Sequence, residues 1–180
     1  MNRLIIASGN QGKIAEFSRL LGREIEGKKL DLPEIQSTDV RAVAKTKAEA
    51  AYAQLGAPVF VDDTGLYIDA WNQLPGALIA WFLDNVGNDG IIKMLAGWDN
   101  RSARVVTALG YCDEHGSQVF VGELTGSIAD TARGDNGFGY DPIFIPEGSD
   151  KTFAEMTSAE KDAISMRAQA AAAMHQGLGW

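Results

Sequence analysis

The sequence predicts a single α/β domain over residues 1–180, with a long mixed sheet and flanking helices. Short β-branched apolar runs alternate with segments whose apolar residues recur at helical spacing, which is typical of an α/β arrangement. A long pair of alternating segments in the second half predicts a β-hairpin. No linker, repeat or low-complexity segment interrupts the chain, and 180 residues suffice for one sizeable core.

The first half of the chain predicts two strand-and-helix units with clear helix boundaries. Residues 3–7 form an apolar run that we expect to be a buried strand, followed by a helix that Gly22 ends. Asp39 can cap a second helix that runs to about residue 55, where Gly56 ends it. The remaining expected elements are strands at 59–61 and 66–70, short helices at 77–86 and 89–96, hairpin strands at 103–113 and 118–128, and one helix from 158 to about 176.

Composition and charge exclude several classes of function. The net charge is −8 and no basic stripe is present, so we expect no binding to polymeric nucleic acid. No apolar run reaches the ~18 residues of a membrane span, and the first residues lack the apolar core of a signal peptide. The single cysteine, Cys112, lies in a strand pattern and favours a core position in a cytoplasmic protein.

The loop after the first strand offers a site for an anion. Ser8, Gly9, Asn10, Gln11, Gly12 and Lys13 stand between a strand and a helix. Backbone amides and the positive end of a helix dipole bind anions at such a position. Lys13 in the first helical turn is unfavourable for the dipole unless an anion lies beside it. A plain strand-to-helix turn explains the same residues, because the spacing of a Walker loop is absent.

Two adjacent carboxylates follow the run at 59–61. In an extended strand Asp62 and Asp63 point to opposite faces, so one of them can face a cleft and bind a divalent cation or deprotonate water. The alternative is a turn, because Asp62, Asp63, Thr64 and Gly65 together are also good turn residues.

A glycine-rich stretch from residue 137 predicts a loop that presents aromatic side chains. Phe138 and Tyr140 alternate with glycines, and Asp141 follows them. A capped helix after Thr157 carries Lys161 and Arg167. An aromatic ring, an acid and two cations suit a nucleotide, although tight turns and a solvated helix give the same residues.

Four blocks in order now resemble the inosine triphosphate pyrophosphatase family, whose members hydrolyse non-standard purine nucleoside triphosphates. The resemblance covers nearly the whole chain, and the last block is the most specific. The blocks are Ser8-Gly9-Asn10 with Lys13 and Glu16; Asp62-Asp63-Thr64-Gly65-Leu66 with Asp69; Pro75-Gly76; and Gly137-Phe138-Gly139-Tyr140-Asp141-Pro142 through Lys151-Thr152, Ala154-Glu155, Glu160-Lys161 and Ser165 with Arg167.

This resemblance implies two lobes around a central cleft, a homodimer, and Mg²⁺-dependent release of pyrophosphate from ITP, dITP or XTP. Asp63 is then the catalytic residue, and Asp63 with Asp62 binds the metal. The residues implied to bind substrate are Ser8, Gly9, Asn10, Gln11, Gly12, Lys13, Thr64, Phe138, Gly139, Tyr140, Asp141, Lys161, Met166 and Arg167.

The chain departs from the family pattern at three places. Ala42 replaces a glutamate that helps to hold the metal, which Glu34 or Asp39 would have to substitute. Met166 replaces a histidine near the base, and Trp81, expected in the core or at an interface, replaces an arginine of bacterial members. Two alternatives therefore stay open: the same reaction on a different base, or a nucleotide-binding protein with impaired catalysis.

Overall fold

The computed structural model describes residues 4–180, so Arg3 of the expected first strand lies outside the described residues. One mixed sheet runs through the molecule in the order β2-β1-β3-β5-β6-β7, and β4 pairs with β3 at one end. β1 is parallel to both of its neighbours, and the other pairs are antiparallel. The strands are β1 Leu4–Ile6, β2 Ile25–Gly27, β3 Val59–Ile68, β4 Pro75–Gly76, β5 Ser102–Asp113, β6 Gly116–Ile128 and β7 Phe144–Pro146.

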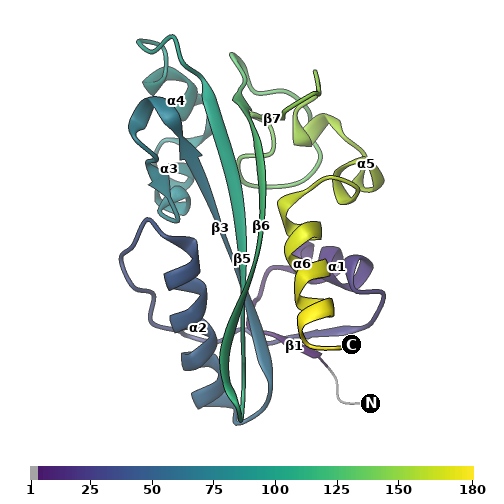
Figure 1. Cartoon of the computed structure of the whole chain (residues 1–180). Helices are drawn as coiled ribbons and strands as arrows, with labels where there is room; N and C mark the ends of the chain where they lie inside the picture. Colours follow the sequence, from purple (N-terminus) through teal and green to yellow (C-terminus); the bar gives the residue numbers. More distant parts are fainter. Residues whose placement is uncertain (1–3) are drawn as a thin grey trace.

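The helices form on both sides of this sheet (Figure 1). Across residues 4–180, no helix combines the length and the apolar character needed to cross a membrane. The helices are α1 Gln11–Leu20, α2 Val40–Leu55, α3 Ile79–Asn85, α4 Gly87–Met94, α5 Ser158–Asp162 and α6 Met166–Gly177, with single 3₁₀ turns at Asp69–Trp71 and Phe153–Glu155.

The predicted caps are confirmed. Asp39 Oδ1 accepts a hydrogen bond from the amide of Arg41 at 2.9 Å and opens α2. Gly56 ends that helix with a left-handed φ of 63°. Thr157 forms the capping box with Glu160 at the start of α5. Local sequence therefore set these boundaries, as expected from the backbone groups that each cap satisfies.

The turn interpretation of residues 62–65 is wrong. β3 continues through them without interruption, and each residue is paired with β5, from Asp62 opposite Leu109 to Gly65 opposite Val106. Ladder pairing along ten residues outweighs the local turn preference of these residues. The alternation of a strand then sends Asp62 and Asp63 to opposite faces of the sheet.

The helix expected from residue 158 to 176 is two helices. α5 is only five residues long, and Ser165 opens α6 by accepting a hydrogen bond from the amide of Ala168 at 3.1 Å. Lys161 and Arg167 therefore stand on different helices rather than along one axis. Ser165 made this break possible, because a serine favours a helix N-cap over a helix interior.

Two glycines let helices approach the β5–β6 hairpin closely from its two faces. A Cβ on Gly110 would lie 2.2 Å from the carbonyl oxygen of Ala44 in α2. A Cβ on Gly122 would lie 1.9 Å from the carbonyl oxygen of Met166 in α6. α2 and α6 flank the hairpin on its two sides in Figure 1. Both helices are thus set by backbone contact with the sheet.

The core divides into two ends along the long strands, which agrees with the expected two lobes. One apolar cluster, containing Ile91, Phe144 and Phe153, fills the end with α3, α4 and β7. Two further clusters fill the end with α1, α2 and α6, one on each face of the sheet. Trp81 belongs to none of the three clusters, because 66% of it is exposed. The core position is therefore wrong, and the interface position stays a prediction.

Candidate active site

A cavity of about 310 Å³ lies where the two lobes meet. Residues from the start of α1, the middle of β3, α2, α3 and the loop before β7 line it. Most residues predicted from the sequence converge here. The lining residues are Asn10, Lys13, Glu34, Lys47, Asp62, Asp63, Thr64, Ala77, Ile79, Ala80, Leu83, Phe138, Gly139, Tyr140, Asp141, Met166 and Arg167.

The loop before α1 is held in a fixed form by its own side chains. Asn10 Oδ1 accepts a hydrogen bond from the amide of Lys13 at 3.2 Å, and Ser8 Oγ accepts one from the amide of Asn10 at 3.1 Å. The first amides of a helix have no partner within the helix, so those of Gln11 and Gly12 can serve an anion. Gly9, Gln11 and Gly12 do not line the cavity but shape this loop beside it.

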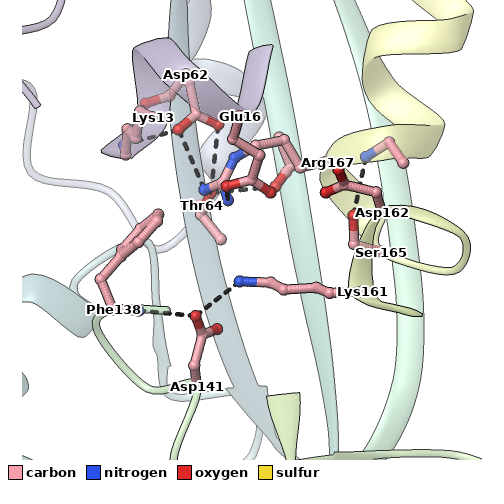
Figure 2. Close-up of polar contacts among 12 residues, drawn as sticks. Lys13, Glu16, Asp62, Thr64, Phe138, Asp141, Lys161, Asp162, Ser165 and Arg167 are labelled. Carbon is pink, nitrogen blue, oxygen red and sulfur yellow. Dashed lines mark hydrogen bonds and ion pairs between the residues drawn. The ribbon is translucent and has the colours of Figure 1, made fainter. Parts of the chain in front are cut away.

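Asp62 is the centre of a buried ionic network (Figure 2). Its Oδ2 lies 2.7 Å from Lys13 Nζ and 3.3 Å from Arg167 Nη2, and its side chain has no exposure. Arg167 Nη1 also lies 2.9 Å from Glu16 Oε2. Burial opposes ionisation, but Arg167 and Lys13 outweigh it and lower the pKa of Asp62 to about 2. Asp62 is therefore an internal counter-ion that positions Lys13 and Arg167.

Asp63 faces the opposite side of β3 and has a different environment. Its Oδ1 lies 2.8 Å from Lys47 Nζ, which also lies 3.0 Å from Glu34 Oε2. Its Oδ2 is buried without a hydrogen-bond partner. Burial raises the pKa of Asp63, and the ammonium of Lys47 offsets only part of that effect. Of the two carboxylates, Asp63 is the one with an oxygen available for chemistry.

Lys47 and Glu16 were not among the residues that the sequence assigned to the site. Lys47 falls on the apolar face of α2 between Ala44 and Ala48, and a lysine on such a face is a signal that it has an acidic partner. Glu16 precedes the buried Phe17 and is itself only 4% exposed. Its partner, Arg167, is 151 residues away in the chain, so local pattern could not reveal the pair.

The loop carrying Phe138 is held by a second buried ion pair. Asp141 Oδ2 accepts hydrogen bonds from the amide of Phe138 at 2.9 Å and from Lys161 Nζ at 2.7 Å, as Figure 2 shows. A Cβ on Gly137 would lie 2.0 Å from the same oxygen, and its φ of 76° also favours glycine. Lys161 and Asp141 thus shape the loop, and their predicted contact with the substrate stays a prediction.

Phe138 lies against two cations from the C-terminal helices. Its ring centroid is 5.3 Å from Lys161 Nζ and 5.2 Å from Arg167 Cζ, within the range of cation–π attraction. Phe138 also lines a neighbouring cavity of about 500 Å³ together with Gly12 and Lys161. The aromatic ring therefore stands between two cavities, in position to stack on a flat group that enters either one.

Tyr140 and Met166 complete the cavity wall with little exposed surface. The hydroxyl of Tyr140 is buried without a partner, and burial raises its pKa well above the ordinary value. Met166 is 2% exposed and packs in the apolar cluster of the α3–α4 end. Thr64 Oγ1 reaches both Thr107 at 3.1 Å and Asp62 at 3.4 Å.

The fold and the site together define a class of protein. A helix N-terminus beside lysines, a buried carboxylate with a free oxygen, and an aromatic ring over cations suit a ligand with phosphates at one end and a flat ring at the other. The comparisons with known proteins agree with this class, because residues 4–177 match the model of the Ham1 family. The chain belongs to that family.

Curated relatives and solved structures extend the match over almost the whole chain. A dITP/XTP pyrophosphatase of Methanopyrus kandleri is 46% identical over 172 residues, which cover 93% of this chain and 92% of the relative. An inosine triphosphate pyrophosphatase of Candida glabrata is 40% identical, covering 93% and 92%. The Ham1 protein of Staphylococcus aureus superposes with a TM-score of 0.87 at 32% identity, covering 99% and 98%. The mixed sheet and overall fold are therefore those of the family.

Proposed function

We propose that this protein hydrolyses non-standard purine nucleoside triphosphates (ITP, dITP and XTP) to the monophosphate and pyrophosphate. One observation carries the proposal. β3 places Asp62, whose charge is neutralised by Lys13 and Arg167, on one face of the sheet, and Asp63, which has a buried oxygen without a hydrogen-bond partner, on the other. A nucleotide pyrophosphatase needs cations held for phosphates and a base held for water. Membership of the Ham1 family supports the same reaction.

Different residues bind the phosphates and accept the proton. Lys13 and the first amides of α1 bind the phosphates, since Lys13 lines the cavity and the helix begins in the loop beside it. Asp63 orients a water molecule and accepts its proton as the water attacks the α-phosphorus and pyrophosphate leaves. Burial raises the pKa of Asp63, which makes this carboxylate a stronger base than an ordinary aspartate.

The site fits Mg²⁺ as the cofactor. Magnesium prefers carboxylate oxygens together with substrate phosphates and water, rather than a cage of protein ligands. Asp63 offers a free buried oxygen, and Glu34 converges on the same ammonium. Within residues 4–180 no group of three or more acidic, histidine or cysteine side chains gathers as a metal site, so substrate phosphates and water would have to complete the coordination. The bound ion would neutralise charge on the triphosphate.

Glu34, rather than Asp62, is the better second metal ligand. Asp62 has Lys13 and Arg167 at its Oδ2 and no exposed side-chain surface. Glu34 is 54% exposed at the edge of the cavity and supplies the carboxylate that Ala42 lacks. This replacement supports catalysis over the alternative of a protein that only binds nucleotides.

Phe138 is the residue that would stack on the base, with Arg167 and Lys161 beside its ring. Met166 offers no hydrogen bond to a base where the family pattern has histidine, so a retuned base preference is the second candidate function. We further propose that the protein acts as a homodimer in the cytoplasm, as the family resemblance and the single buried Cys112 favour.

The test is pyrophosphate release from ITP, XTP, dUTP and the four common nucleoside triphosphates with Mg²⁺. We expect selective turnover of ITP and XTP by the wild type, a loss of at least about 10²-fold in Asp63→Asn, and normal turnover in Asp130→Asn, which alters a 90% exposed carboxylate. Turnover of another base would favour the second candidate. Tight binding without pyrophosphate from any substrate would refute an enzymatic role.

A further inference from the structure

The ammonium of Lys47 stands between the two carboxylates that we assign to the metal. Lys47 Nζ is 2.8 Å from Asp63 Oδ1 and 3.0 Å from Glu34 Oε2. Its side chain is 18% exposed, and that of Asp63 is 13% exposed. The ammonium of Lys47 neutralises Asp63 and Glu34, but it occupies the two carboxylates that a divalent cation would need as ligands. The lysine and the metal therefore compete for one position.

The charge balance of the whole site shows why this competition matters. Among the described residues, each cation that lines the cavity or pairs with a carboxylate lining it has a carboxylate partner. A nucleoside triphosphate that entered this cavity would thus meet cations that are already paired. The site contains four cations (Lys13, Lys47, Lys161 and Arg167) and five carboxylates (Glu16, Glu34, Asp62, Asp63 and Asp141).

Lys47 is the cation that is most readily released. Lys161 and Arg167 are buried and paired with carboxylates that are themselves buried. Lys13 is bound by both the side chain and the backbone carbonyl of Asp62. By contrast, one partner of Lys47, Glu34, is half exposed, and Lys47 itself lines the cavity. A lysine stem is flexible, so its nitrogen can turn to a new anion without movement of the helix.

We propose that Lys47 is an exchange residue: a divalent cation displaces its ammonium from Asp63 and Glu34, and the released ammonium then binds the phosphates of the substrate. This inference rests on the proposed function, because it assigns the metal to the same two carboxylates. It explains how an acidic site accepts a polyanion, since the ion adds two positive charges and frees a third. Metal and phosphate binding are coupled through one side chain.

Calorimetric titration of Mg²⁺ without nucleotide tests the exchange directly. We expect Lys47→Met to bind Mg²⁺ at least about tenfold more tightly than the wild type, because no ammonium competes with the ion. With Mg²⁺ saturating, the same variant should bind inorganic pyrophosphate at least about tenfold more weakly. Lys45→Met is the matched control, since Lys45 lies on the same helix but pairs with the exposed Glu49, and we expect no change in either affinity.

In the exchange, Lys47→Met raises the affinity for Mg²⁺ and lowers the affinity for pyrophosphate. If Lys47 had only a structural role, the substitution would lower both affinities. Equal or weaker Mg²⁺ binding by Lys47→Met would overturn the inference, as would a wild type that binds no Mg²⁺. If circular dichroism shows that Lys47→Met is unfolded, the same titrations are made with Lys47→Gln. This variant keeps a hydrogen-bond donor for Asp63 but removes the charge. These measurements need no turnover, so a protein inactive on every triphosphate would refute the proposed function and still leave the exchange supported.

Discussion

Replacing Asp62 by asparagine tests the buried network that positions Lys13 and Arg167. The carboxylate is fully buried and has both cations within 3.3 Å of one oxygen. Asparagine keeps the size of the side chain and removes its charge, so the network of two cations and two carboxylates gains a net positive charge. Breaking a buried pair in this way is strongly destabilising.

The pKa of Asp62 gives the magnitude. A fall from 3.8 to about 2 on folding corresponds to roughly 2–3 kcal/mol of folding free energy at neutral pH. Because the pKa is lower in the folded state, this stability is fully present above pH ~4 and is lost as the pH falls toward ~2. At pH 3 about half of it should remain. We therefore expect Asp62→Asn to destabilise the fold by about 3 kcal/mol at pH 7.

Urea unfolding followed by circular dichroism at pH 7 and pH 3 measures both quantities. Asp130→Asn serves as the control, because Asp130 is 90% exposed beside Arg101 and should contribute less than about 1 kcal/mol at either pH. A difference below about 1 kcal/mol between wild type and Asp62→Asn at pH 7 would show that the ionised Asp62 does not stabilise the fold. A difference that is the same at pH 3 would show that the effect does not come from the ionised carboxylate.

Two further predictions concern the packing of α6 and the aromatic loop. Gly122→Ala should destabilise the fold by about 1–3 kcal/mol, because its Cβ would meet the carbonyl oxygen of Met166. Gly97→Ala is the control, since a Cβ there would have no atom within 4 Å. Thermal unfolding measures both variants, and equal melting temperatures would contradict the close approach of α6. Phe138→Ala should weaken calorimetric binding of inosine monophosphate by about 1–3 kcal/mol without changing that of pyrophosphate, and an equal loss for both ligands would argue against stacking.

Much of the local structure could be predicted from residues close together in the chain. The N-caps at Asp39 and Thr157 and the end of α2 at Gly56 all satisfy backbone groups within a few residues, so the sequence alone contains the cause. The alternation in the second half likewise predicted the hairpin, with strands slightly longer than expected. β2 was not predicted, because its three residues form a strand only by pairing with β1.

The errors arose where a distant partner or a competing helix cap decided the outcome. Local preference alone allowed a turn at residues 62–65, but pairing with β5 extended the strand through them. Lys161 and Arg167 fitted one helical pattern, but the cap formed by Ser165 separated them. Trp81 was expected in the core or at an interface, and its exposure excludes only the core. In each case a longer-range contact or a competing cap outweighed local pattern.

The order of the residues already contains the family motifs, the alternation of Asp62 and Asp63, and the chemistry available at the site. The use of those groups follows from the packing of the folded chain. Asp62 became a buried counter-ion because Lys13 and Arg167 meet it from two helices. Asp63 kept a buried oxygen without a partner because Lys47 pairs with its other oxygen. Charge pairing depends on separations of a few ångströms, and such separations between distant residues are set by the packing of the whole fold.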